Sequence, residues 1–241
     1  MKITLFTLAR NTGHRLEEWI HFHNKIGVDE FLIYLDYPTD DSEERLESLQ
    51  KRYNVSYEVL PKDGNYYDGG LSKWEEEHGS LHPIMSTLIP RQLKAANKAL
   101  DFLKLKYKGV DHWTAFHDVD EFLVPQKEMS LKNIVKKYQG FYDRIVAYDY
   151  RFDQPSDLFG SYLEHSTIRR PVTNIVSHWP TRKSLVKTRY CGKIKCQHDM
   201  DQSPYLIIDD ELKLNHYREE ASFPKESYFI EDTRALEILK S

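Results

Sequence analysis

Apolar and polar positions follow two different periods over the first sixty residues of the chain. Apolar runs rich in β-forming residues cover Lys2–Ala9, Glu30–Tyr37 and Val55–Leu60, and they predict three strands. Helical spacing of apolar residues predicts a helix from Arg15 to Ile26, and a second one from about Glu43 to Tyr53. This alternation of strands and helices favours a parallel sheet with right-handed crossovers, which binds ligands at the carboxyl ends of its strands.

The rest of the chain continues as a mixture of helices and strands without a repeat, a low-complexity tract or a linker. We therefore expect one α/β domain over residues 1–241, with a mostly parallel central sheet flanked by helices. The further predicted elements are a helix over Leu88–Leu105, a strand over Trp113–Val124, a helix from Ser130 to Tyr138, a strand over Arg144–Phe152, and a C-terminal helix after Pro224.

Composition excludes several classes of protein. The net charge of −4 argues against a dedicated nucleic-acid binder, which is usually strongly basic. No apolar run approaches the ~20 residues of a membrane span, and the N-terminal residues do not resemble a secretory signal. Cys191 and Cys196 are too few for a disulfide scaffold, so we expect reduced thiols and a cytoplasmic location.

The most informative segment is Phe116–Leu123, which places three acids in an apolar, aromatic stretch. Buried carboxylates need a compensating positive charge. If the segment is a strand, Asp118 and Asp120 point to the same face, and a divalent cation is the simplest relief of their repulsion. The alternative is that these acids, with Glu121, pair with Lys or Arg or cap a neighbouring helix.

Eight short motifs follow one another in a characteristic order and spacing. They are Arg10-Asn11, Leu16–His23, Gly27-Val28, Phe31–Tyr34, Gln92–Asn97, Asp118–Phe122, Lys183–Lys187 and Asn215–Arg218. This set resembles glycosyltransferase family 92 and related bacterial glycosyltransferases. Two positions depart from the family pattern, because Thr12 stands where Glu is usual and Asp36–Asp41 replaces a D-N-x-S-x-D loop.

The resemblance implies a GT-A-type nucleotide-binding sandwich and a metal-dependent transferase. Residues 1–125 would bind a nucleotide-sugar, and residues 126–241 would bind a glycan acceptor. The donor would be linked to UDP, the sugar would be galactose as in characterised relatives, and transfer would invert the anomeric centre. The metal would be Mn²⁺ or Mg²⁺, which neutralises a leaving diphosphate.

The resemblance also assigns roles to individual residues. Asp118, Asp120 and His216 would hold the metal, with Asp118 contacting it through water or contacting the ribose, and Glu121 would orient a ligand or hold a Lys or Arg. The residues expected to contact the donor are Arg10, Asn11, Asp36, Asp118, Lys183, Lys187 and Arg218. The expected base is Asp153, with Glu164 and Asp199 as alternatives. His198 is expected either to bind the metal or to have a structural role. The Tyr66–Trp74 loop would close over the donor.

Two other functions remain open from the sequence. A phosphohydrolase or nuclease would use the three acids and His117 to bind two cations, and a carbohydrate-binding protein would use the same scaffold without catalysis. The expected partners are a nucleotide-sugar and a glycan acceptor, with no nucleic acid and no transmembrane segment. The sequence leaves peripheral association with a membrane open.

Overall fold

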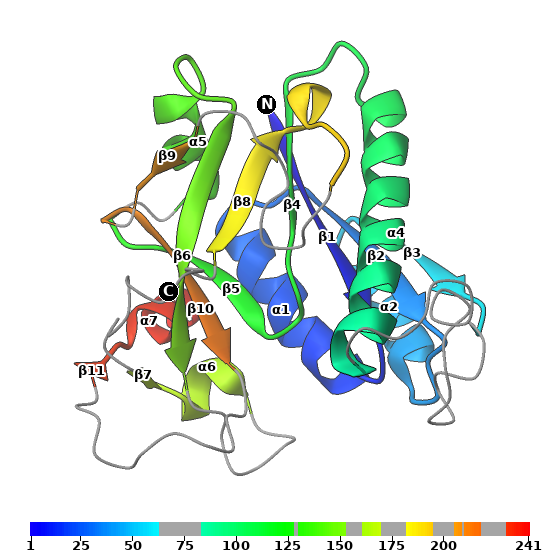
Figure 1. Cartoon of the computed structure of the whole chain (residues 1–241). Coiled ribbons are helices and arrows are strands. Elements are labelled where there is room, and N and C mark those ends of the chain that lie inside the picture. Colours follow the sequence, from blue (N-terminus) through cyan, green and yellow to red (C-terminus); the bar gives the residue numbers. More distant parts are fainter. Residues whose placement is uncertain are drawn as a thin grey trace.

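A computed structural model shows a curled sheet with helices on both faces (Figure 1). It describes residues 1–62, 83–127, 130–152, 161–169, 182–194, 205–208, 210–217 and 230–241. The strands are β1 (Lys2–Ala9), β2 (Glu30–Asp36), β3 (Val55–Leu60), β4 (His112–Phe116), β5 (Glu121–Pro125), β6 (Arg144–Phe152), β7 (Ile168–Arg169), β8 (Arg182–Lys187), β9 (Leu206–Ile207), β10 (Leu212–Tyr217) and β11 (Ile230–Glu231). The helices are α1 (Gly13–Lys25), α2 (Ser42–Gln50), α4 (Pro83–Lys106), α5 (Leu131–Tyr138), α6 (Tyr162–His165), α7 (Arg234–Lys240) and the 3-10 helix η2 (Thr188–Tyr190).

The sheet is parallel in its first half and mixed in its second half. The main strand order is β11-β7-β6-β8-β4-β1-β2-β3, and the pairs β1·β2, β2·β3 and β1·β4 are parallel. Strand β8 is antiparallel to both β4 and β6, and β10 is antiparallel to β5 but parallel to β6. The expectation of a mostly parallel sheet is therefore correct only for the first half of the chain, where a helix crosses between successive strands.

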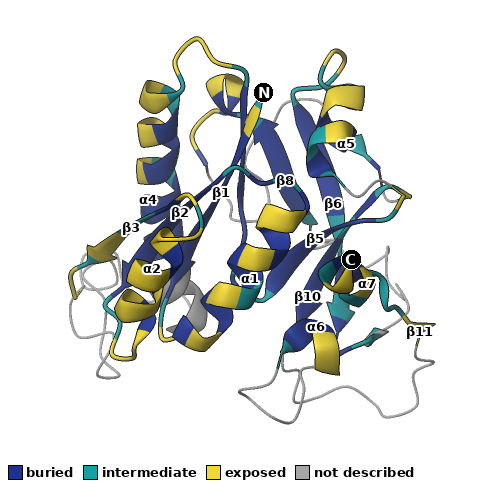
Figure 2. Cartoon of the chain, turned by 180° about the vertical axis from the view of Figure 1, so that it is seen from behind, coloured by how far each residue is buried: buried dark blue, intermediate teal, exposed yellow. Residues whose placement is uncertain are grey.

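The two faces of the sheet bury separate apolar cores (Figure 2). Alternate residues of β1 point to opposite faces: Ile3 and Leu5 pack beneath α1 and α2, whereas Phe6 and Leu8 pack beneath α4. On the α4 side, the small residues Ala95, Ala96 and Ala99 are buried against the sheet and allow the helix to approach it closely.

The single strand predicted over Trp113–Val124 is two strands, β4 and β5, separated by residues 117–120. Because β5 leaves β4 and pairs with β10, this break carries the chain from the first half of the sheet into the second. The acids of this segment therefore lie in a turn. Among the helices of the described ranges, none has the length and apolar character needed to cross a membrane.

Candidate active site

The acids Asp118, Asp120 and Glu121 form a turn at the carboxyl end of β4, which we call the acid turn (residues 118–121). The backbone N–H of Asp118 donates to Oε2 of Glu121 at 2.9 Å, so Glu121 closes the turn from inside. The expectation that Asp118 and Asp120 share the face of a strand is wrong, because a turn lacks the two-residue period. Their side chains are 29% and 27% exposed, whereas that of Glu121 is 2% exposed.

Lys183 lies on one side of the acid turn and is buried. Its Nζ is 2.9 Å from Oε2 of Glu121 and 3.3 Å from Oδ2 of Asp118. Burial alone would lower the pKa of Lys183, but the two carboxylates outweigh it and raise the pKa above its usual value. The expectation that Glu121 holds a Lys or Arg is confirmed. Lys183 is committed to these acids and is 2% exposed, so it presents no ammonium surface to a diphosphate.

His216 lies on the other side of the acid turn, in β10 between β5 and β6. Its Nε2 is 3.5 Å from Oδ2 of Asp120, and its Nδ1 donates to Oδ2 of Asp149 at 3.1 Å. Burial would lower the pKa of His216, but the hydrogen bonds to Asp120 and Asp149 prevail and raise it to about 10. The structure thus brings Asp120 and His216 together, as the resemblance implies, and adds Asp149 behind the imidazole.

The carboxyl group of Glu121 is buried and its pKa is shifted. Burial raises its pKa to about 7, and the positive charge of Lys183 opposes that rise. His117 precedes the turn and is completely buried, and burial followed by the charge of Lys183 lowers its pKa well below the usual value. The acid turn is therefore a dense group of alternating charges rather than a set of free carboxylates.

These residues can be tested for their fit to a divalent cation. Among the described residues, no three His, Cys, Asp or Glu side chains converge as a ready-made metal cage. Two donors, Oδ2 of Asp120 and Nε2 of His216, do face each other, and a carboxylate fixes the other ring nitrogen of His216. Such a carboxylate behind a histidine is the usual partner of a metal ligand. Magnesium-type sites commonly take one or two protein ligands and fill the rest with phosphate and water, so the pair fits.

The carboxyl ends of β1 and β2 carry unusual backbone. Asn11 and Tyr37 follow these strands with φ of +52° and +45°, a region that non-glycine residues seldom occupy. The amide of Asn11 donates to Oγ1 of Thr39 at 3.0 Å and accepts from its N–H at 2.8 Å. Asp40 accepts from the N–H of Gly13 at 3.0 Å. The loop Asp36–Asp41, which departs from the family pattern, therefore holds Asn11 in place, because the side-chain amide of Asn11 makes both of these hydrogen bonds with Thr39.

A cavity of about 300 Å³ opens beside these loops, between the ends of β1 to β3 and the first described turns of α4. Its walls combine apolar side chains with both signs of charge, from Leu8, Asp36, Glu58, Leu60, Pro61, Lys62, Arg91, Lys94, Ala95 and Lys98. Asp36 and Arg91 form a buried ion pair in it. Burial, followed by the nearby charge of Arg10, lowers the pKa of Arg91 to about 10. Arg10 therefore lies close to this pair, as expected of a donor contact.

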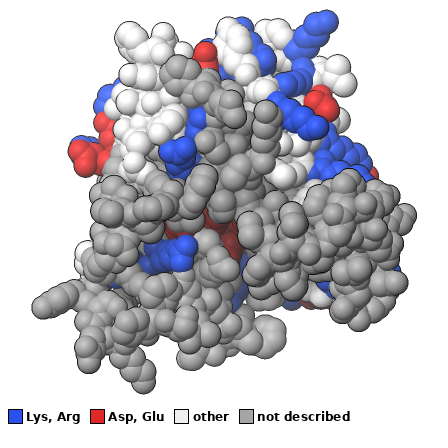
Figure 3. Space-filling view, in the orientation of Figure 1, with Lys and Arg blue, Asp and Glu red and all other residues white. Residues whose placement is uncertain are grey.

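Helix α4 connects this cavity to the acid turn. Arg91 pairs with Asp36, and the next residue, Gln92, donates from Nε2 to Oδ1 of Asp118 at 3.3 Å. Two consecutive side chains thus contact two acids that are 82 positions apart in the sequence. The cavity and the acid turn are parts of one site, and Figure 3 shows acidic side chains at the bottom of a hollow near the middle of this face.

Other expected site residues lie elsewhere or outside the described residues. Lys187 is at the opposite end of β8 from Lys183, near Asp111 and Asp143 at 4.0 and 3.6 Å, so the structure does not bring it to the acid turn. The remaining expectations lie outside the described residues; they concern Asp153, His198, Asp199, Arg218 and the Tyr66–Trp74 loop.

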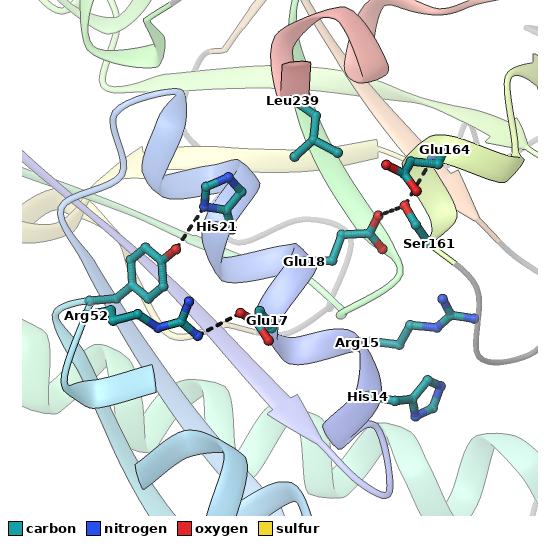
Figure 4. Close-up of a pocket in the computed structure, with 10 residues that line it drawn as sticks. His14, Arg15, Glu17, Glu18, His21, Arg52, Ser161, Glu164 and Leu239 are labelled. Carbon is teal, nitrogen blue, oxygen red and sulfur yellow. Dashed lines mark hydrogen bonds and ion pairs between the residues drawn. The ribbon is translucent and has the colours of Figure 1, made fainter. Parts of the chain in front are cut away.

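A second cavity, of about 470 Å³, lies on the outer side of α1 (Figure 4). Two acids of its walls have partners: Glu17 is 2.7 Å from Arg52, and Glu18 accepts from the backbone N–H of Tyr162 at 3.0 Å. Glu164, which competed with Asp153 for the role of base, lines this cavity and belongs to α6. The structure gives Glu164 no contact with the acid turn.

The sequence comparisons place the chain in a family. The model of glycosyltransferase family 92 matches residues 9–227, and the chain belongs to this family. A family 92 protein of Ricinus communis is 27% identical over 136 residues, which are 56% of this chain and 19% of the relative. One of Oryza sativa is 26% identical over 133 residues, 55% of this chain and 18% of the relative. The chain thus aligns with about a fifth of the length of these curated relatives.

Solved structures with a related outline include S. aureus TarS. Its complex with UDP-GlcNAc aligns with a TM-score of 0.48 at 16% identity, covering 95% of this chain and 62% of TarS. Its complex with UDP aligns with a TM-score of 0.46 at 13% identity, covering 89% of this chain and 60% of TarS.

Two residues of the site, Arg91 and Asp149, carry no signal that the sequence pattern could reveal. Arg91 follows Pro90 in a segment that predicts an ordinary helix, whereas Gln92 begins the family motif Gln92–Asn97, which does not indicate the contact with Asp118. Asp149 lies in the predicted strand over Arg144–Phe152, and the sequence predicts no role for it. Only the pairing of β6 with β10, in which Leu214 lies opposite Asp149, brings that carboxylate to His216.

Proposed function

We propose that this chain transfers a sugar from a nucleotide-sugar to a hydroxyl of a glycan acceptor, on a GT-A-type scaffold. The observation that carries the proposal is the bridge made by α4, in which Arg91 and Gln92 join the cavity to the acid turn. A nucleotide-sugar needs two adjoining subsites, one for the nucleoside and one for the diphosphate with its metal. Family membership supports the same activity.

The cavity beside β1 and β2 suits the nucleoside part of the donor. Leu8, Leu60 and Ala95 offer apolar walls to a flat base, and the ion pair of Asp36 and Arg91 lines the same cavity, where we expect a base or ribose to lie against it. Arg10 and the lysines on the rim supply positive charge toward phosphate oxygens. UDP is the donor nucleotide we propose, with galactose as the sugar.

Asp120 and His216 are the residues that would hold a divalent cation, Mn²⁺ or Mg²⁺. When bound there, the cation would neutralise the negative charge of the departing diphosphate. The chain's own contribution is orientation: Asp149 fixes the ring of His216, while Lys183 and Gln92 hold Asp118 at the edge nearer the cavity. Our proposal for Asp118 is contact with the ribose, or with the metal through a water molecule.

The acceptor would lie on the side of β6 and β10, in residues 126–241. We propose Asp153 as the base that takes the proton of the acceptor hydroxyl, with inversion at the anomeric carbon. Asp153 directly follows Phe152, whose partner in the register is Tyr217, the neighbour of His216. Its position in the chain supports the proposal.

Calorimetric titration of UDP, with and without Mn²⁺, tests the donor and metal parts. The wild-type chain should bind UDP more tightly with Mn²⁺, and Asp120→Asn should lose that gain, about tenfold or more in affinity. The matched control is Asp101→Asn, which removes an exposed carboxylate from the outer face of α4. Equal Mn²⁺ dependence in Asp120→Asn and the wild type would overturn the metal assignment.

Product analysis with UDP-sugars and a panel of oligosaccharide acceptors tests the reaction. A new glycosidic product that requires Asp120 supports transfer. Cleavage of phosphate esters without transfer would support the hydrolase alternative. Sugar affinity that neither EDTA nor Asp120→Asn changes would support a carbohydrate-binding protein.

A further inference from the structure

The end of the molecule opposite the acid turn is unusually apolar. It consists of the end of α4, the turn at residues 107–111, the turn at residues 139–143 and η2, and we call it the far edge. The five most exposed large apolar side chains among the described residues all belong to it, and they are Phe141 (84%), Leu105 (78%), Tyr190 (52%), Phe102 (45%) and Val110 (44%).

Hydrogen bonds and ion pairs show that these segments form one edge. The N–H of Lys2 donates to the carbonyl of Asp111, and the N–H of Lys187 donates to that of Asp143. The Nζ of Lys187 then lies between the carboxylates of Asp111 and Asp143. His112 joins η2 to the same edge through Oγ1 of Thr188 at 2.6 Å. In Figure 1 the two turns are the two uppermost points of the molecule.

The charge of the far edge is opposite in sign to that of the whole chain. Its basic side chains are Lys2, Lys104, Lys106, Lys108, Lys136 and Arg189, and the acids beside them are Asp101, Asp111 and Asp143. Of the basic groups, Lys106 is paired with the buried Glu30. In Figure 3 the upper part of the surface is mostly white and blue with small red areas. A chain with a net charge of −4 thus presents a basic, apolar edge.

We propose that the far edge docks the protein on a membrane surface that contains anionic lipids. Aromatic and aliphatic side chains at protruding points enter the headgroup region, while surrounding Lys and Arg attract anionic headgroups. Protruding points suit a flat surface. A symmetric contact with a second copy would bring the basic edge against itself, which charge repulsion opposes.

Docking through this edge leaves the candidate active site open. The acid turn follows β4 at its carboxyl end, whereas the far edge precedes β4 at His112. Five residues of strand separate them by about 16 Å. The bound protein would therefore hold its donor cavity away from the lipid. This inference does not depend on the proposed transferase activity, because it requires only the surface.

Sedimentation of the full chain with extruded vesicles tests the proposal. Phosphatidylcholine vesicles with phosphatidylglycerol should bind the protein, and pure phosphatidylcholine vesicles should bind it much less. Raising the salt to about 0.5 M should weaken binding, because the Debye length falls to a few ångströms. Phe141→Gln with Leu105→Gln should lower the vesicle partition constant about tenfold or more.

Ile230→Gln is the matched control, because Ile230 is 38% exposed on β11 at the other end of the molecule. It should bind vesicles like the wild type. Equal loss in Ile230→Gln and in the double variant, or no binding to anionic vesicles at all, would overturn the proposal. A concentration-dependent dimer in light scattering that the double variant abolishes would assign the far edge to self-association instead.

Discussion

The segment Asp118–Val124 is held from two sides by contacts of opposite kinds. On the side of β8 and β10 the contacts are ionic, through Lys183 and His216. On the side of α1 they are neutral. The indole of Trp19 donates to the carbonyl of Glu121 at 3.0 Å, and Nε2 of His23 accepts from the N–H of Leu123 at 3.1 Å.

The two histidines show what separates the sides. His23 and His216 are both buried, but burial lowers the pKa of His23 to about 3, whereas carboxylates raise that of His216 to about 10. Both hydrogen bonds of the His23 ring are to backbone groups: Nε2 accepts from Leu123, and Nδ1 donates to the carbonyl of Trp19 at 2.8 Å. Burial therefore does not decide the charge of a histidine; the groups that face it do. The neutral contacts hold the backbone of this segment, and the ionic contacts orient the side chains of the acid turn and of His216.

Removing the positive charge of Lys183 from the ionic side should have the largest effect. Lys183→Met leaves Glu121 and Asp118 without their partner in a buried position, which costs about 3–5 kcal/mol of unfolding free energy. Urea unfolding measures the loss. Lys183→Met combined with Glu121→Gln should recover part of it, because the uncompensated charge is then absent. A loss below about 1 kcal/mol in Lys183→Met would show that the pair is solvated.

Loosening the ionic side without removing a ligand should have an intermediate effect. Asp149→Asn keeps the shape of the group behind His216 but removes its charge, and such changes typically cost 10–100-fold in metal affinity or activity. Titration of Mn²⁺ into the UDP complex measures the loss. Asp143→Asn is a suitable control, because that exposed acid lies at the far edge. An unchanged Mn²⁺ affinity in Asp149→Asn would indicate that His216 has a structural role and does not bind the metal.

Helix α1 and the first half of the sheet were predictable from the sequence, whereas the contacts of the neutral side were not, because Trp19 and Glu121 are 102 positions apart and His23 and Leu123 are 100 positions apart. Strands β1, β3 and β6 match their predicted ranges residue for residue, because each is a local apolar run with clear breaks at its ends. Helix α1 follows from its helical spacing, which also places Trp19 toward the core. These features depend on neighbours within a few positions, which a sequence displays directly.

The ionic side was predictable only in part. The acids were found from their place in an apolar stretch and His216 through a family motif, but their arrangement depends on the pairing of β10 with β5 and β6, whose partners are 65 to 95 positions apart in the sequence. No local pattern records such a pairing. The same reason explains why Lys183 and Lys187 were assigned one role: they share a motif, and only the register of β8 shows that they lie at opposite ends of this strand, near different groups.

Weakening the neutral side should have the smallest effect, and its pH dependence identifies it. His23→Gln retains an amide that can still serve both backbone groups, so the cost near pH 8 should be about 1 kcal/mol. Between pH 6.5 and 3 the unfolded wild-type chain binds a proton at His23 while the folded chain does not, so stability falls as the pH falls. His23→Gln loses this contribution, and its stability should fall less steeply, by up to about 1.4 kcal/mol per pH unit.

Urea unfolding of both chains from pH 7 to pH 4 measures this difference. His112, whose pKa burial lowers to about 4, contributes with the same sign in both proteins and cancels when the two curves are subtracted. The difference should therefore be small near pH 7 and shift in favour of His23→Gln at lower pH. A flat difference would mean that His23 binds its proton at the same pH in the folded and unfolded chains, so that the acid turn would have a charged group on both sides at low pH.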